Sequence, residues 1–155
     1  MVLYYTHKQK TKIFAQAISE LRDIPTHELK SDLSKKSGFA FIFNALKLTL
    51  TKKTSPVTNI PENVPHEIYV CSPVWGGRPA APVKYFLENS ALRQTKVHLI
   101  LTASAPTDKY RKNAVEYLQN LPCIVGDVFV FQTNGEMPPD KEVLKEQLQD
   151  LLEIC

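Results

Sequence analysis

Short apolar segments alternate with segments of helical periodicity along most of the chain, and this alternation limits the folds open to it. The apolar segments are 2–6, 67–71, 96–102 and 125–131, with a weaker strand signal at 28–30. Apolar side chains recur every three or four residues in three other segments, 11–21, 108–121 and 140–154. This pattern predicts an α/β fold, in which a parallel sheet is covered by helices on both faces.

The edge of such a sheet is where a ligand is expected. In open α/β sheets, ligands bind beyond the carboxyl ends of the strands, at the point where the strand order reverses. The loops that follow the first, third and fourth strands are therefore the candidate binding loops.

The loop after the third strand has the composition of a site for a flat, electron-rich ligand. It leads into a helix that is expected to end near Asn89, and its residues are Pro73, Val74, Trp75, Gly76, Gly77 and Arg78. Glycines let a ligand approach the backbone closely, and prolines fix a turn. Trp75 can cover one face of a ring, while Arg78 and the free N–H groups at the helix start can meet negative charge. The alternative interpretation is a turn in which Trp75 only covers the sheet.

Bulk composition places the chain among soluble globular proteins. Its 155 residues suit one domain, 1–155, with 43% apolar and 23% charged residues. The longest apolar stretches, 39–43 and 128–131, are too short to span a bilayer, and the N-terminus reads directly into a strand rather than a signal peptide. Three widely spaced cysteines favour a reducing, cytoplasmic compartment and imply neither a disulfide framework nor a metal site.

Several of these segments together resemble the flavodoxin family over nearly the full length. The resemblance is carried by Tyr4-Tyr5-Thr6 with Thr11-Lys12, by Ser72-Pro73-Val74-Trp75-Gly76-Gly77 with Pro79, Pro82 and Phe86-Leu87, and by Leu101-Thr102. It implies a flavodoxin-like three-layer sandwich with a five-stranded parallel sheet of order 2-1-3-4-5. The implied cofactor is FMN.

The first loop departs from the family pattern. Flavodoxins hold the FMN phosphate on a loop of the type (S/T)-x-T-G-x-T, and the corresponding residues here are Thr6, His7, Lys8, Gln9, Lys10 and Thr11. Both outer hydroxyls are kept, but Lys8 replaces the central hydroxyl and Gln9 replaces the glycine. The loop can still bind phosphate through its lysines, or it is a solvated turn that has lost this function.

The third loop is plain in composition. It contains Thr102, Ala103 and Ser104, without the glycine that flavodoxin relatives usually have there. If FMN binds, the flavin carries the redox chemistry and the protein supplies position and electrostatics, so no catalytic residue is expected. The four histidines are scattered, and His7 is the one that lies in a candidate loop.

Two functions remain open. In the first, the chain is an FMN-dependent redox protein, either an electron carrier or a small NAD(P)H-dependent reductase. In the second, it is a flavin-free flavodoxin-fold protein that acts as a binding or interaction module. A net charge of +3 differs from the acidic surface typical of flavodoxin shuttles, and it is too small to indicate nucleic-acid binding.

The segment 35–65 is expected to be an inserted helix followed by a proline-rich return, and it resembles an insertion of some short bacterial flavodoxin-like proteins. Residues 38–50 would form a helix with apolar side chains on almost every face, and lysines flank this segment in the sequence. We expect most of these side chains to pack against the sheet. A homodimer interface, a flap over the flavin and a membrane-surface helix are the alternatives.

Overall fold

A computed structural model describes residues 1–35, 38–51, 53–105, 107–133 and 140–153 of the chain. The elements follow in the order β1 (Val2–Tyr4), α1 (Lys10–Arg22), β2 (Thr26–Glu28), the short 3₁₀ helix η1 (Asp32–Lys35), α2 (Gly38–Thr51), β3 (Glu67–Trp75), β4 (Arg78–Pro79), α3 (Ala81–Asn89), β5 (Lys96–Ala103), α4 (Asp108–Gln119), β6 (Ile124–Gln132) and α5 (Lys141–Glu153).

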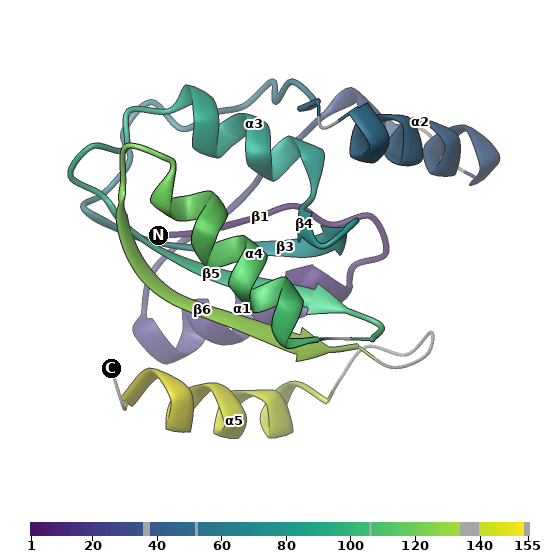
Figure 1. Cartoon of the computed structure of the whole chain (residues 1–155). Helices are drawn as coiled ribbons and strands as arrows, with labels where there is room; N and C mark the ends of the chain where they lie inside the picture. The colour runs from purple at the N-terminus through teal and green to yellow at the C-terminus, as the bar shows by residue number, and fades with distance from the viewer. Residues whose placement is uncertain (36–37, 52, 106, 134–139, 154–155) are drawn as a thin grey trace.

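Five parallel strands form the sheet in the order β2-β1-β3-β5-β6 (Figure 1). Numbered along the chain without β4, this order is 2-1-3-4-5, so the predicted flavodoxin-like α/β sandwich is confirmed. The short strand β4 was not predicted. It pairs antiparallel with the end of β3, outside the parallel ladder.

The two faces of the sheet have separate cores because neighbouring residues of a strand point to opposite faces. Leu3, Val70 and Leu99 share one core with buried residues of α3 and α4. The other core is shared with α1 and α5, and it includes Val2, Tyr69, Cys71, Ile100 and Leu148. Burial on both faces explains why the central strands are almost continuously apolar.

Strand β2 lies two residues earlier than the 28–30 expected from the sequence. The backbone of Val2 donates a hydrogen bond to the carbonyl of Pro25 at 2.9 Å, and Leu29 donates to Tyr4 at 2.7 Å. Pairing with β1 therefore begins directly after Pro25. The apolar side chain of Leu29 then enters the core just beyond the strand.

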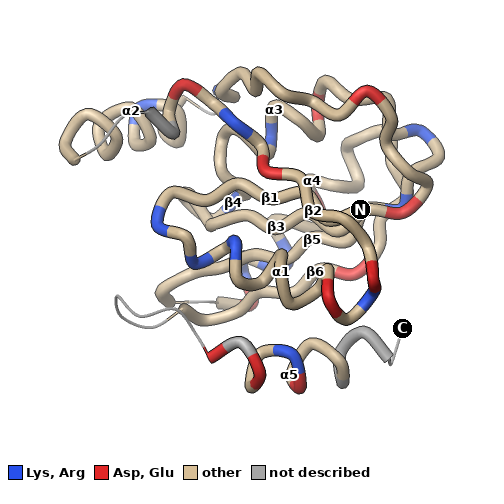
Figure 2. The backbone as a smooth tube through the Cα atoms, turned by 180° about the vertical axis from the view of Figure 1, so that it is seen from behind, with Lys and Arg blue, Asp and Glu red and all other residues tan. Residues whose placement is uncertain are grey.

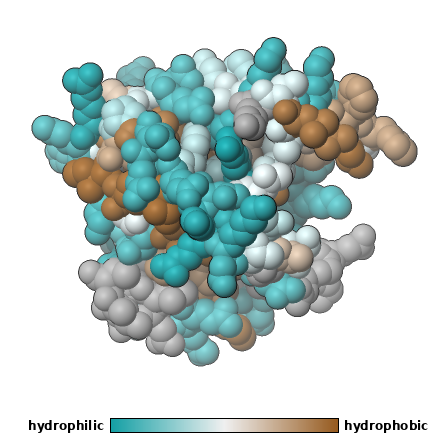
Figure 3. Space-filling view, viewed as in Figure 1, coloured by the Kyte–Doolittle hydropathy of each residue, from teal (hydrophilic) through white to brown (hydrophobic). Residues whose placement is uncertain are grey.

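The expectation that the apolar helix would pack against the sheet is wrong. No residue of α2 is buried, and its large exposed side chains form a stripe of Phe39, Ile42, Phe43, Leu46 and Leu50, which we call the outer stripe. Since α3 and α4 already cover that face of the sheet, α2 extends beyond the carboxyl ends of the strands (Figure 1). In Figure 3 its apolar surface is the brown area at the upper right.

The return from α2 to β3 is held to the body by hydrogen bonds. Ser55 donates its backbone N–H to Ala81 at 3.2 Å, and Thr58 donates to Lys30 at 3.0 Å. The hydroxyls of Ser31 and Ser55 lie 2.7 Å apart in a buried contact. In the part of the chain that the structure describes, no helix combines the length and the apolar character that crossing a membrane requires.

The position of α2 gives a test of the fold. Phe43 is 70% exposed, so Phe43→Ser should change the free energy of unfolding by less than about 0.5 kcal/mol. Phe14 is 1% exposed, and Phe14→Ala should cost about 3–5 kcal/mol. Chemical denaturation of both variants measures these values. A cost above about 2 kcal/mol for Phe43→Ser would show that the outer stripe is covered.

Candidate functional site

The three loops expected to bind a ligand meet at the carboxyl ends of the strands around a cavity of about 260 Å³, which we call the edge cavity. Its lining residues are Thr6, His7, Lys8, Lys10, Thr11, Phe41, Pro73, Val74, Trp75, Thr102, Ala103, Ser104 and Thr133. The lining combines hydroxyl groups, two lysines and aromatic rings. Such a set suits a ligand that has both a flat ring and an anionic group.

The first loop turns sharply before α1. Gln9 has φ 60°, in the left-handed region where glycine is favoured, and α1 begins at the next residue. Behind the turn, the buried hydroxyls of Thr11 and Thr102 lie 3.1 Å apart and join the first loop to the end of β5. The expectation that glycine would suit position 9 thus agrees with the backbone found there.

Positive charge gathers at this loop. Lys8 is exposed and Lys10 is half-buried, and both line the edge cavity. Figure 2 shows the blue segments of the connection between β1 and α1 at one end of the sheet. Together with the backbone N–H groups at the start of α1, these ammonium groups favour an anion.

An aromatic cluster stands at the edge cavity. The rings of His7 and Phe41 are stacked, with centroids 3.4 Å apart and an angle of 2° between the planes. Trp75 meets Phe41 edge-on at 5.7 Å and Tyr5 edge-on at 5.8 Å. Phe41 belongs to α2, so the apolar helix contributes one ring to the cavity.

The stack on Phe41 also affects the charge of His7. Removal of the ring from water lowers the pKa of His7, and the nearby ammonium of Lys8 lowers it further. Neutral imidazole is therefore favoured in the folded protein. The loop keeps its positive charge on lysines rather than on this histidine.

The run from Pro73 to Arg78 does not face one cavity. Gly76 and Gly77 have φ values of 58° and 78°, and they reverse the chain so that Trp75 pairs with Arg78. Positive φ at both central residues is the requirement of the tightest hairpin turn. Gly76 and Arg78 consequently line a second hollow, on the side of α3 and α4.

The structure therefore divides the predicted site. Most of its residues line the edge cavity, whereas Gln9, Gly76, Gly77 and Arg78 do not. Gly76, Gly77 and Arg78, which were expected to lie with the other loops at one ligand, stand outside the lining of the edge cavity. The cause is the pairing of β4 with β3, which turns these residues away.

Two residues of the edge cavity were not predicted. Thr133 directly follows the end of β6 and lines the cavity. A hydroxyl residue just after the last strand of the predicted sheet was the sequence signal that could have indicated it. Phe41 was seen only as part of an apolar segment, and nothing in the local pattern separates it from Phe39 or Phe43. Only the path of the whole helix brings its ring to His7.

The buried histidine His98 stabilises the sheet and lies away from the edge cavity. His98 is 2% exposed, and its ring nitrogens lie 3.0 Å from Glu67 and 2.8 Å from Asp127. These residues stand toward the amino ends of β3, β5 and β6, away from the edge cavity. Among the described residues, no three His, Cys, Asp or Glu side chains are grouped to hold a metal ion.

Comparison with known proteins identifies similar folds. No family model matches the sequence, and no curated protein matches it significantly. A proposed flavoprotein of Bacteroides eggerthii has a TM-score of 0.73 at 11% identity, with 97% of this chain and 96% of that chain covered. A flavoprotein of Lactobacillus acidophilus in complex with FMN has a TM-score of 0.64 at 25% identity, covering 83% of this chain and 90% of that one.

A flavodoxin of Streptococcus pneumoniae also has a similar fold. Its TM-score is 0.54 at 14% identity, with 99% of this chain and 97% of that chain covered. The structural neighbours are thus flavodoxin-like flavoproteins, as the resemblance in the sequence implied. At this level of identity, the similarity establishes the fold.

The left-handed turn makes a prediction about stability. Replacement of Gln9 by glycine removes about 1–2 kcal/mol of backbone strain from the folded state. It also makes the unfolded chain more flexible, which lowers the free energy of unfolding by about 0.5–1 kcal/mol. We expect Gln9→Gly to raise the free energy of unfolding by up to about 1 kcal/mol, while Gln9→Ala, which keeps the strain, gives no gain. Thermal or chemical denaturation of the pair tests this. Destabilisation by glycine would mean that the Gln9 side chain stabilises the turn.

The stack on Phe41 makes a prediction about titration. His7 should titrate below its ordinary pKa of about 6.5. The unfolded chain therefore binds a proton more readily, and the folded protein loses stability as the pH falls below about 6.5. Phe41→Ala returns water to the ring and should raise the pKa of His7, and Lys8→Ala should raise it less. NMR titration of the His7 ring protons measures the pKa. An unchanged pKa in Phe41→Ala would contradict the stack.

Proposed function

We propose that the chain binds FMN in the edge cavity and acts as a flavin-dependent redox protein. The observation that carries this proposal is the meeting of a basic, hydroxyl-bearing first loop with Trp75 and the end of β5 around one cavity. The FMN complex of the Lactobacillus acidophilus flavoprotein, which shares the fold, supports the same choice of cofactor.

The residues of the cavity fit the chemical parts of FMN. Phosphate is a dianion that hydroxyls, lysines and helix-start N–H groups bind well, and the first loop offers all three. Trp75 is half-buried, and its ring is anchored edge-on by Tyr5. The small side chains of Ala103 and Ser104 leave room along the end of β5.

The size of the cavity indicates how much of a ligand it encloses. Ligand pockets usually measure about 300–1,000 Å³, and the edge cavity is slightly smaller at about 260 Å³. It therefore suits partial enclosure, with a phosphate-bearing chain inside and a ring at the mouth beside Trp75. The aromatic cluster with Phe41 would shield that ring from water.

Bound FMN supplies one- and two-electron transfer, while the protein holds and shields it. In this role Thr6, Lys8, Lys10 and Thr11 hold the phosphate, and Trp75 covers the ring. A net charge of +3 does not suit docking on basic partners, so a reductase that takes electrons from a nicotinamide fits at least as well as a shuttle. The redox partner would then be a small molecule or an acidic protein.

A flavin-free binding module is the second candidate. Gln9 has a side chain where close approach of a phosphate favours glycine, and Phe41 already stacks on His7 at the cavity. Both features are explained if the cavity no longer receives a flavin. The two functions differ in one property, which is saturable binding of FMN.

We also propose a cytoplasmic location and a homodimer for the chain. A cytoplasmic location is supported by the free thiols of Cys71 and Cys123, which suit a reducing compartment. A homodimer is supported by the outer stripe of α2, because exposed apolar surface of this kind favours burial against another chain.

The test uses Trp75, the only tryptophan of the chain, as a fluorescent reporter. FMN should quench its emission saturably. Lys8→Ala should weaken FMN binding about twofold to fivefold, since the loss of one exposed charge contact is worth roughly 0.4–1 kcal/mol. The control Lys112→Ala removes an exposed charge from α4, away from the edge cavity, and should leave the affinity unchanged.

Riboflavin separates the contribution of the phosphate from that of the ring. Because it lacks the phosphate, its affinity should not respond to Lys8→Ala. Trp75→Ala, followed by flavin fluorescence, should weaken both ligands at least about tenfold. Absence of saturable FMN binding by the wild-type protein would reject the flavin proposal in favour of the binding module.

A further inference from the structure

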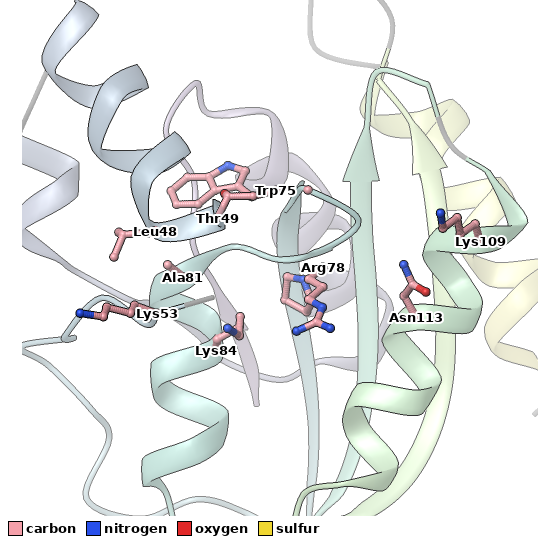
Figure 4. Close-up of a pocket in the computed structure, with 11 residues that line it drawn as sticks. Leu48, Thr49, Lys53, Trp75, Arg78, Ala81, Lys84, Lys109 and Asn113 are labelled. Carbon is pink, nitrogen blue, oxygen red and sulfur yellow. The ribbon is translucent and has the colours of Figure 1, made fainter. Parts of the chain in front are cut away.

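A second hollow of about 280 Å³ shares the lining residue Trp75 with the edge cavity. We call it the basic hollow. It is bounded by α2, the turn between β3 and β4, α3 and α4, and Figure 4 shows the side chains that line it. Its lining residues are Leu48, Thr49, Lys53, Trp75, Gly76, Arg78, Pro79, Ala81, Lys84, Lys109 and Asn113.

Four cationic side chains line this hollow, and none of its lining residues is acidic. They come from four separate segments, namely Lys53 after α2, Arg78 in β4, Lys84 in α3 and Lys109 in α4. In Figure 4, Arg78 lies between Lys84 and the amide of Asn113. Within the described residues, neither Lys53, Arg78 nor Lys109 forms an ion pair.

Lys84 is placed where a cation is costly. The residue is 7% exposed, and removal of an ammonium group from water disfavours its charged form. Burial lowers the pKa of Lys84, the carboxylate of Glu88 partly opposes this, and the positive charge of Arg78 adds to it. Glu88 itself is exposed and accepts a hydrogen bond from Tyr117 at 2.8 Å. Two cations that disfavour each other are thus held at one hollow.

The backbone adds to the positive character of the hollow. Helix α3 begins at Ala81, which lines it, and no side-chain hydrogen bond caps the helix start. The dipole of a helix N-terminus and the N–H groups of its first turn, other than Pro82, which has none, attract anions. The start of α3 and cationic residues from four segments therefore line the same hollow.

The turn that carries Arg78 is held firmly in place. The N–H of Ala80 is close to both Ser72 Oγ at 2.9 Å and the carbonyl of Pro73 at 3.1 Å, and Asn113 donates to the carbonyl of Gly77 at 3.4 Å. A Cβ atom at Gly76 would overlap the methyl group of Thr49 in α2. The walls of the hollow are thus packed against one another, which lowers the entropic cost of binding.

We propose that the basic hollow binds a phosphate group, at a site distinct from the edge cavity. Its volume accommodates a phosphate or pyrophosphate group rather than a complete dinucleotide. The group could come from inorganic phosphate or pyrophosphate, or from NADPH, whose remaining parts would lie outside the hollow. The planar guanidinium of Arg78 suits such an oxyanion because it can donate two parallel hydrogen bonds.

Calorimetric titration of the purified protein with pyrophosphate, inorganic phosphate and NADPH in a phosphate-free buffer tests this. We expect saturable binding of at least one of them, weakened at least tenfold by Arg78→Ala. Arg93→Ala removes the same charge from an exposed loop after α3 and should leave binding unchanged. Lys84→Met keeps most of the buried side chain and should also weaken binding, provided that its circular dichroism spectrum is unchanged.

The three ligands distinguish the sources of the phosphate group. Binding of NADPH that depends on Arg78 would assign the hollow to a nicotinamide donor, and binding of pyrophosphate or phosphate alone would assign it to a free anion. Either result supports the proposal. No saturable binding of any ligand at millimolar concentration would overturn it, and so would equal losses in Arg78→Ala and Arg93→Ala.

This proposal does not depend on flavin binding, and the variants separate the two sites. Thr11→Val removes a hydroxyl of the edge cavity and should weaken FMN but leave pyrophosphate unaffected. Arg78→Ala should do the reverse. Pyrophosphate binding that responds to Thr11→Val and not to Arg78→Ala would place the anion in the edge cavity and overturn the inference.

Discussion

Parallel pairing of β1, β3 and β5, buried on both faces, is the constraint from which the rest of the structure follows. Parallel strands must be joined by crossover connections, so all of their carboxyl ends reach the same edge of the sheet. The loops that begin at Thr6, Pro73 and Thr102 are therefore neighbours, although they are far apart in the sequence. The hydrogen-bonding distance between the hydroxyls of Thr11 and Thr102 shows how closely they meet.

The return of β4 onto β3 is the local feature that gives this edge its particular form. Because Arg78 pairs with Trp75 in this turn, it lines the hollow that is bounded by α3 and α4. Trp75 lines two hollows of similar size, one rich in hydroxyl groups and one rich in cations. Two adjacent glycines with positive φ form the turn that lets β4 pair with β3 and so produces this division.

Much of this could be predicted from the sequence, because periodicity and strand-end loops are local signals. The alternation of strands and helices and the three loops belong to this class, whereas the order of the sheet and the glycine expected at position 9 were implied by the resemblance to flavodoxins. The path of α2 could not be predicted in this way, because an apolar helix is compatible both with packing on a sheet and with exposure. Its position depends on whether neighbouring helices already cover the sheet. The division of the run from Pro73 to Arg78 also escaped prediction, because β4 has only two residues and no pattern of its own.

The exposed outer stripe of α2 has a consequence for local stability. A helix of 14 residues is marginal by itself in water, and α2 has no buried residue to stabilise it. Its backbone amides are therefore expected to exchange with solvent through local opening, at a smaller free energy than global unfolding requires. Any surface that covers the stripe would slow this exchange in α2 alone, while the amides of the central strands would keep their own rate.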